Sequence, residues 1–268
     1  MSGDGGETSE DAVLGGKLLL RQPRRGHRFG HDSILLAAAT PAQPGEQAVD
    51  LGSGVGAAGL ALARRVVGVA VTLIELDPAL AALAGDNAAR NGLADRVHAV
   101  CLDVAAPAAA FAASGLVPGL APGSADRVLM NPPFNAPHNP SPDRARRMAR
   151  TASLETLEQW LRTAVRLLRP SGTVTLIWRA DGLGEVLAAL AADYGAVSIL
   201  PVHPKPGAAA IRVLVRAAKE RGGPLTLLPG FILADAAGKP TAQAETVLRD
   251  GAALTLTGSC ETGSGSCN

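Results

Sequence analysis

An apolar stretch, a run of glycines and an alanine-rich stretch follow one another without interruption in residues 48–66, AVDLGSGVGAAGLALARRV. The first part is typical of a short buried strand, and the last part has the composition of a helix. Gly54, Gly56 and Gly59 fit the pattern G-x-G-x-x-G, in which glycines form a tight turn and let a ligand approach the backbone. A strand joined to a helix in this way indicates a fold built on a parallel sheet.

The rest of the chain repeats this alternation of strand and helix. We expect strands at 48–51, 71–76, 96–103, 125–130, 172–178, 196–202 and 209–217, and helices at 57–66, 78–92, 154–168 and 183–192. Such alternation predicts a doubly wound, Rossmann-like α/β fold with a sheet of seven mostly parallel strands. The Pro/Gly-rich turn between the last two strands predicts that they form an antiparallel terminal hairpin. In sheets of this kind, ligands bind outside the carboxyl ends of the strands.

The chain is predicted to form a single domain, residues 13–255, between two tails. Residues 1–12 are polar and acidic, and residues 256–268 are rich in Gly and Ser, so we expect both tails to be disordered. The domain divides into an N-terminal segment, a Rossmann-like core and a C-terminal extension, at 13–47, 48–217 and 218–255. In the extension, LTLLPGFILAD (225–235) predicts a hairpin and TAQAETVLRDG (241–251) predicts a short helix.

Composition excludes several classes of protein. The net charge is +1, which gives no overall sign of a polyanionic partner, so any basic surface must be local. No stretch approaches the ~18 apolar residues of a membrane span, and the acidic N-terminus does not resemble a signal peptide. We therefore expect a cytoplasmic protein with no membrane contact.

Three cysteines are too few and too badly spaced for a zinc site or a disulfide framework. Two of them lie in the C-terminal tail. Cys101 lies in a predicted strand, where we expect a buried thiol. The sequence predicts no metal site.

Two ligands are compatible with the glycine turn when it is considered alone. A nicotinamide dinucleotide would use the same turn, with Glu75 at the end of the next strand binding the ribose. Asp50, just before Gly52, favours a different ligand, because a carboxylate repels a pyrophosphate and attracts a cationic ammonium or sulfonium group.

The fourth predicted strand ends abruptly at Asn131-Pro132-Pro133-Phe134. Two prolines stop a strand because neither can donate a backbone hydrogen bond. If this strand lies beside the first, the amide oxygen of Asn131 and the carbonyl of Pro132 can both accept hydrogen bonds from one planar NH₂ group. Phe134 can stack on the flat molecule that carries the amine. These four residues are the predicted catalytic residues.

Both motifs have counterparts in one class of enzyme. The stretch from Asp50 to Gly56 resembles motif I of class I S-adenosylmethionine methyltransferases. The NPPF tetrapeptide resembles motif IV of the amino-methyltransferases, (N/D)-P-P-(F/Y/W), which modify adenine N6, guanine N2 or a glutamine amide. The resemblance implies that Glu75 binds both ribose hydroxyls and that Asp103 binds the adenine amino group, with the Val104 backbone beside it. A helix cap is the alternative role for Asp103.

The segment before the glycine turn narrows the resemblance. Only 49 residues precede Asp50, which argues against the glutamine-modifying and two-domain guanine-modifying enzymes. QPRRGHRFGHDSILLAAA (22–39) is similar to the R-x-G-x-D-x-x-L-L-A stretch of the bacterial tRNA adenine-N6 methyltransferases related to the one that modifies A37 of tRNA-Val. In that family the segment lines the cofactor pocket, which suggests Arg28, Phe29, Gly30 and Asp32. A helix cap is the alternative for Asp32 or Ser33.

The resemblance covers residues 13–254, and it departs from the tRNA enzyme at Phe134, where that enzyme has a tyrosine. Stacking is preserved by this change and a hydroxyl contact is lost. The residues predicted to hold S-adenosylmethionine are Arg28, Gly30, Asp32, Asp50, Gly52, Ser53, Gly54, Gly56, Glu75, Leu76, Asp103, Val104 and Asn131.

Local clusters of arginine predict an RNA partner. PDRARRMAR (142–150) follows the NPPF motif directly, and RQPRRGHR (21–28) lies before the glycine turn. The first is expected to be a loop, and the two clusters together are expected to form a cationic rim that contacts phosphates, although a solvated, mobile loop without a partner is the alternative. The residues expected to contact RNA are Arg24, Arg25, Arg144, Arg146, Arg147 and Arg150.

We therefore expect a methyltransferase that acts on an exocyclic amine, with adenine N6 in tRNA or another structured RNA as the favoured target. Guanine N2 of rRNA and a protein glutamine are the alternatives within the class. An NAD(P)-dependent oxidoreductase and a non-catalytic RNA-binding module are more distant alternatives. The sequence gives no indication of the oligomeric state.

Overall fold

The structure is a computed structural model that describes residues 8–24, 29–114, 117–133 and 143–256, with the backbone alone for residues 143–152. The description below concerns these residues.

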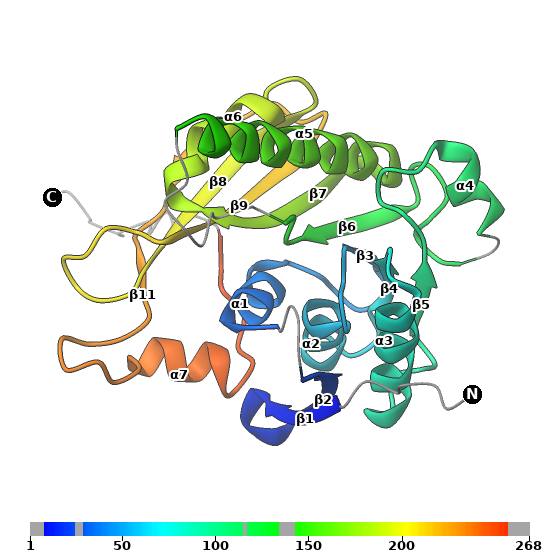
Figure 1. Cartoon of the computed structure of the whole chain (residues 1–268), viewed down its shortest axis with the longest axis horizontal. Coiled ribbons are helices and arrows are strands. Elements are labelled where there is room, and N and C mark those ends of the chain that lie inside the picture. Colours follow the sequence, from blue (N-terminus) through cyan, green and yellow to red (C-terminus); the bar gives the residue numbers. More distant parts are fainter. Residues whose placement is uncertain (1–7, 25–28, 115–116, 134–142, 257–268) are drawn as a thin grey trace, which may run out of the picture.

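A nine-stranded mixed sheet forms the centre of the molecule (Figure 1). Its strands lie in the order β10-β8-β9-β7-β6-β3-β4-β5, with β11 also paired to β8. The strands β3 to β7 are parallel, and β9 runs antiparallel to both of its neighbours, β7 and β8. The bounds are β3 (Gln47–Leu51), β4 (Ala70–Glu75), β5 (Val97–Cys101), β6 (Ala125–Met130), β7 (Leu168–Arg179), β8 (Tyr194–His203), β9 (Arg212–Lys219), β10 (Thr226–Leu227) and β11 (Phe231–Ile232). The predicted α/β fold and the β8–β9 hairpin are confirmed.

Helices cover both faces of the sheet (Figure 1). One face packs against α1 (His31–Ala39), α2 (Ala57–Arg65) and α3 (Pro78–Arg90). The other packs against α4 (Ala108–Ala113), α5 (Asp143–Leu167) and α6 (Leu183–Leu190). Short 3-10 turns lie at Leu14–Gly16 and Ala180–Gly182, and α7 (Ala242–Leu248) follows the last strand.

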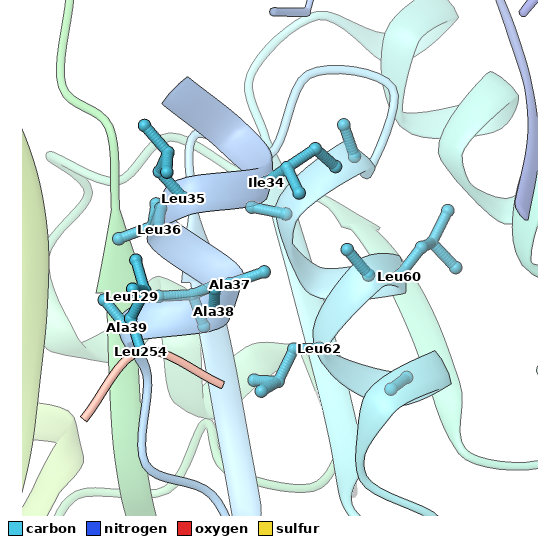
Figure 2. Close-up of a cluster of buried hydrophobic side chains, with 14 of the residues drawn as sticks. Ile34, Leu35, Leu36, Ala37, Ala38, Ala39, Leu60, Leu62, Leu129 and Leu254 are labelled. Atoms are coloured by element: carbon cyan, nitrogen blue, oxygen red, sulfur yellow. The ribbon is translucent and has the colours of Figure 1, made fainter. Parts of the chain in front are cut away.

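Alternation along the central strands divides the core into two layers. In β6, Leu129 faces α1, whereas Val128 and Met130 belong to the cluster on the α5 side. Figure 2 shows the first layer, in which side chains of α1 and α2 meet Leu129, and Leu254 from the C-terminal segment joins them. Because Ala, Leu and Val supply most of this packing, the core needs few aromatic residues.

The pairing of β3 with β6 brings the two sequence motifs to one edge of the sheet. Leu51 pairs with Met130 as the last residue of each strand, so the glycine turn and Asn131 both begin directly beyond this pair. The carboxyl end of β4, at Glu75, lies on the other side of β3. This edge is where a ligand is expected in a doubly wound sheet.

The predicted hairpin at 225–235 is wrong. Both β10 and β11 pair in parallel with β8 and not with each other. Backbone bonds from Leu228 to Ile199 and from Leu233 to His203 keep the segment alongside β8, whose edge is otherwise open. The two apolar stretches thus extend the sheet, and Pro229-Gly230 marks a step along one edge rather than a reversal. The short helix predicted after them is confirmed as α7, where the Thr241 side chain caps the first turn.

The prediction of a disordered tail at 1–12 is wrong for residues 8–12. Thr8–Val13 form β1, which pairs antiparallel with β2 (Leu18–Pro23) in a separate two-stranded sheet. Only every second residue of β1 is partly buried, so the strand can form from a mostly polar sequence. The polar composition of this segment therefore did not indicate disorder. Leu18 and Leu20 of β2 anchor the hairpin to the core.

Three smaller predictions also need correction. The helix expected at 154–168 begins at Asp143, so the segment predicted as a basic loop is helical in its backbone. The helix α4 was not predicted, because AAAFAA carries no periodic pattern. Cys101 is exposed rather than buried, since it is the last residue of an edge strand.

In the part of the chain that the structure describes, no helix is both long and apolar enough to cross a membrane.

Asn87 of α3 joins the β1–β2 hairpin to the glycine turn. Its Nδ2 donates to the carbonyl oxygens of Arg21 at 2.9 Å and of Val55 at 3.0 Å, and its Oδ1 accepts from the Arg21 N–H at 2.8 Å. One helical turn later, Asn91 makes similar bonds with the backbone of Leu19, at 2.9 and 2.7 Å. Asn87 is fully buried, whereas the bonds of Asn91 are exposed to water.

Replacing Asn87 by Ala should lower the free energy of unfolding by about 2–4 kcal/mol, because it leaves the carbonyl of Val55 and the part-buried N–H and carbonyl of Arg21 without a partner. Asn91→Ala is the matched control, and it should lower this free energy by less than about 1 kcal/mol because water replaces the lost bonds. Urea unfolding followed by circular dichroism measures both. Equal losses for the two variants would contradict the role given to Asn87.

Candidate functional site

The glycine turn between β3 and α2 is tied to the neighbouring strand β4. The Ser53 N–H donates to the carbonyl of Ile74 at 2.9 Å, and the Gly54 N–H donates to Oε2 of Glu75 at 2.8 Å. The Ser53 hydroxyl oxygen is buried, and it has no hydrogen-bond partner among the described residues. A buried hydroxyl without a partner indicates a site that a polar ligand completes.

Three glycines of the turn have positive φ, at +69° for Gly52, +56° for Gly54 and +87° for Gly56. Residues with a Cβ rarely adopt this conformation. A Cβ on Gly56 would lie 2.9 Å from the side chain of Leu73, so this glycine is required by packing against the core. A Cβ on Gly54 would meet no atom within 4 Å. The turn is therefore open at Gly54, where a ligand can approach the backbone.

Asp50 lies on the α2 side of β3 and is only 2% exposed. Its Oδ2 accepts a hydrogen bond from the Gly59 N–H of α2 at 2.8 Å. Burial raises the pKa of the Asp50 carboxyl from its ordinary value of 3.8 to about 7; the bond from Gly59 opposes this rise and the negative charge of Glu75 adds to it. A cation bound nearby would favour the ionised form, but contact between Asp50 and the cofactor stays a prediction.

Glu75 and Leu76 stand side by side at the end of β4. Oε2 of Glu75 accepts from Gly54 and Oε1 accepts from the Asp77 N–H at 3.0 Å, which leaves each oxygen a further lone pair for a ligand hydroxyl. Leu76 is 63% exposed, an unusual degree for a large apolar side chain at a strand end. This pair combines acceptors for a ribose with an apolar surface for a flat ring.

Asp103 follows β5 on the same edge and is exposed. Its Oδ1 accepts from the Ala105 N–H at 2.8 Å, which holds a turn. The alternative role as a helix cap is wrong, because α4 begins at Ala108 with Pro107 as its N-cap. Val104 is buried, and its carbonyl accepts from the Thr163 hydroxyl of α5 at 2.8 Å.

Asn131 is the first residue beyond β6. Its Oδ1 is buried, and the described part of the chain offers it no hydrogen-bond donor. Pro132 is buried and Pro133 is exposed, while Phe134 lies outside the described residues. Leaving a buried acceptor without a partner costs about 1–3 kcal/mol, so the arrangement indicates a donor that arrives with the substrate.

The N-terminal segment is only partly described, since Arg28 lies outside the described residues. Gly30 is the N-cap of α1 and no side chain caps this helix, so the alternative roles of Asp32 and Ser33 as caps are wrong. Oδ2 of Asp32 instead accepts from the Arg212 guanidinium of β9 at 2.9 Å. Phe29 and Gly30 line a cavity of about 600 Å³ between the β1–β2 hairpin, α1 and the end of α7. The contacts seen for these residues are therefore with β9 and with this cavity, and not with the glycine turn.

Of the arginines expected to contact RNA, Arg24 is exposed and its Nε donates to the carbonyl of Thr8 at 3.4 Å. Arg25 lies outside the described residues. The side chains of the other four, Arg144, Arg146, Arg147 and Arg150, also lie outside them, although their backbone is helical.

Sequence reasoning missed two residues of α5 that reach the same edge. Trp160 contacts the glycine turn at Gly52, and Thr163 binds Val104. Trp160 is one of two tryptophans in a chain with 3% aromatic residues, and this scarcity is the signal that could have drawn attention to it.

Comparison with known proteins identifies the family. Residues 27–200 match the family described as the methyltransferase small domain. The chain belongs to this family. It is an S-adenosylmethionine-dependent methyltransferase, so the oxidoreductase and the non-catalytic alternatives are excluded.

Several relatives of this methyltransferase carry more specific names. A tRNA1(Val) (adenine(37)-N6)-methyltransferase of Bacteroides thetaiotaomicron is 32% identical over 191 residues, which cover 70% of this chain and 75% of the relative. The enzyme of the same name from Yersinia enterocolitica is 30% identical over 198 residues, covering 73% and 74%. The predicted resemblance to this group is confirmed.

A solved structure extends the comparison to the fold. The crystal structure of a predicted O-methyltransferase from Agrobacterium tumefaciens matches this methyltransferase with a TM-score of 0.69 and 28% identity. The match covers 83% of this chain and 98% of the other.

The residues at the sheet edge fit S-adenosylmethionine. The open backbone at Gly54, the unpartnered hydroxyl of Ser53 and the spare lone pairs of Glu75 suit a ligand with a ribose and a polar amino-acid end. The exposed Leu76 suits its adenine ring.

Replacing Glu75 by Ala should weaken S-adenosylmethionine binding by about 30-fold or more, because it removes two charged acceptors and releases the Gly54 N–H. Isothermal titration calorimetry measures the affinity. Glu46→Ala is the matched control. Glu46 pairs with Arg127 just before β3, at the amino ends of the strands and away from the candidate site. Its loss should leave affinity within about twofold. An unchanged affinity for Glu75→Ala would remove Glu75 from the site.

Proposed function

We propose that this methyltransferase modifies N6 of an adenine in tRNA, in the cytoplasm. The observation that carries the proposal is the buried Oδ1 of Asn131, an acceptor without a donor at the carboxyl end of β6. The names of the relatives from Bacteroides and Yersinia support adenine in tRNA as the target.

The site chemistry follows from the two acceptors. S-adenosylmethionine supplies a methyl group on a positively charged sulfur. Oδ1 of Asn131 and the carbonyl of Pro132 each accept one hydrogen bond from the substrate NH₂ group, which turns the nitrogen lone pair out of conjugation with the ring. Pro132 and Pro133 restrict the backbone that carries these acceptors, so little reorganisation accompanies the reaction. Phe134 stacks on the base, which must leave its own base stack to reach the site.

The relative from Agrobacterium, described as a predicted O-methyltransferase, raises transfer to oxygen as a second candidate. A hydroxyl group has one proton to donate, whereas Asn131 and Pro132 together offer two acceptors. The pair therefore favours an amine. Guanine N2 and a glutamine amide also carry NH₂ groups, so the choice among amines rests on the relatives' names.

Incubation with isotopically labelled S-adenosylmethionine and total tRNA, followed by nucleoside mass spectrometry, tests the proposal. The expected product is labelled N6-methyladenosine. Label in N2-methylguanosine, in a ribose or in protein instead would overturn the adenine assignment and identify the alternative. A tRNA pool from cells lacking the gene is the appropriate substrate, because its target positions are unmodified.

A further inference from the structure

Gly52 and Gly54 have similar backbone conformations and different surroundings. A Cβ on Gly52 would lie 2.1 Å from Cη2 and 2.8 Å from Cζ3 of Trp160, whereas a Cβ on Gly54 would meet nothing within 4 Å. Real atoms do not approach to 2.1 Å, so an indole in this position permits only glycine at residue 52. The first glycine of the turn is therefore matched to a side chain of α5.

The same helix also contacts the loop after β5. The Thr163 hydroxyl is buried and donates to the carbonyl of Val104 at 2.8 Å. Residues three apart lie on one face of a helix, so Trp160 and Thr163 face the sheet edge together. Leu157, Leu161 and Ala164 fix this part of α5 in the core, where each is at most 2% exposed.

The two contacts lie on either side of the cofactor edge. Gly52 opens the turn after β3, Val104 follows β5, and β4 with Glu75 lies between them. Glu75 and Ile74 already tie the turn to β4. With Trp160 in contact at Gly52, the turn is held both from the neighbouring strand and from the helix layer above.

We propose that Trp160 is a positioning residue for S-adenosylmethionine. Its indole supports Gly52 and Ser53 from the α5 side and holds the open backbone at Gly54 in the conformation that receives the cofactor. Thr163 holds Val104 from the same helix. The inference rests on the placement of the cofactor at this turn and is independent of the RNA substrate.

Variants of Trp160 separate positioning from general stability. Trp160→Ala should weaken S-adenosylmethionine binding by about tenfold or more, because a displaced turn loses contacts that need sub-ångström placement. Trp160→Phe, which retains part of the ring, should lie between this variant and the unchanged protein. Leu190→Ala is the control: it empties a buried core position in α6 and should lower the melting temperature while leaving affinity within about twofold. Calorimetry at a temperature well below all melting transitions provides the affinities.

A compensating pair gives the sharper test. Gly52→Ala should weaken cofactor binding by about 100-fold, and the double variant Gly52→Ala/Trp160→Ala should bind about tenfold more tightly than Gly52→Ala. The clash is relieved in the double variant, while the positive-φ strain and the loss of the indole's support remain. Gly54→Ala is the matched control, with a similar φ and no clash, and adding Trp160→Ala to it should recover nothing.

The outcomes distinguish this inference from the proposed site. Failure of the unchanged protein to bind S-adenosylmethionine, or full binding by Gly54→Ala, would remove the cofactor from the turn altogether. Equal affinities for Trp160→Ala and Leu190→Ala would leave the site intact and overturn the role of Trp160. If Gly52→Ala does not fold, the comparison of Trp160→Ala with its control variant alone decides whether Trp160 positions the turn.

Discussion

Asn131→Ala should reduce methyl transfer by at least about 10³-fold while S-adenosylmethionine affinity stays within about tenfold. The amide oxygen is buried and makes no hydrogen bond to the described residues, so its removal does not break a protein contact. It would remove a contact that exists only with the substrate amine. The loss should therefore appear in turnover and not in cofactor binding or melting temperature.

Asn131→Asp separates the acceptor role from the shape of the residue. A carboxylate also accepts hydrogen bonds, and the motif that Asn131–Phe134 resembles admits aspartate, so this variant should retain at least about tenfold more activity than Asn131→Ala. Single-turnover transfer to tRNA with saturating cofactor measures the chemical step. Normal turnover by Asn131→Ala would show that another group orients the amine.

Sequence patterns predicted the central sheet well because β3, β4 and β6 are largely buried and bounded by turn residues. The expected strand 125–130 is β6 as observed, and 48–51 lies within β3. Pro78 and Gly92 were expected to bracket a helix, and α3 begins at Pro78 with Asp77 as its N-cap and ends one residue before Asn91. Local chemistry decides these elements, so a single sequence contains enough information.

Prediction failed where tertiary contacts decide the structure. The β1 strand is polar and forms because β2 lies beside it, and β10 and β11 form because β8 has an open edge. At the site, the motifs indicated which residues line the sheet edge, but they could not show which partners those residues have. Asp32 pairs with a residue 180 positions away. The contact of Gly52 with Trp160 joins the glycine turn to a helix that follows the NPPF motif in the sequence.

The partners also change the explanation of the glycine turn. Three of its glycines have different surroundings: Gly56 avoids Leu73, Gly52 avoids Trp160, and Gly54 faces open space at the edge where the cofactor is proposed to bind. One sequence pattern thus contains a glycine required by the core, a glycine required by α5 and a glycine beside the proposed ligand site.

Asp50→Asn should stabilise the cofactor-free protein above neutral pH. The pKa of Asp50 is about 7 in the folded protein and 3.8 ordinarily, so the folded state holds a proton that the unfolded state releases. Stability contributed by this group is fully present below pH 3.8, falls as the pH rises towards 7, and stays lost above it. The loss is on the order of 4 kcal/mol for a shift of this size.

An amide at residue 50 stays neutral at every pH and can still accept the Gly59 N–H, so the variant should lack this fall. The difference in unfolding free energy, Asp50→Asn minus the unchanged protein, should therefore be small at pH 4 and rise to a plateau above pH 7. Urea unfolding across pH 4–9 without cofactor measures it. A flat difference would show that Asp50 is ionised throughout, and a difference that grows toward low pH would show that the folded state favours the carboxylate.

Because a cationic cofactor beside Asp50 would lower its pKa, binding of S-adenosylmethionine near pH 6.5 should release a proton in the unchanged protein and none from this residue in Asp50→Asn. Calorimetry in buffers of different ionisation enthalpy detects that proton. If no proton is released, Asp50 does not interact with the cofactor and its only role is to accept the hydrogen bond from Gly59 of α2.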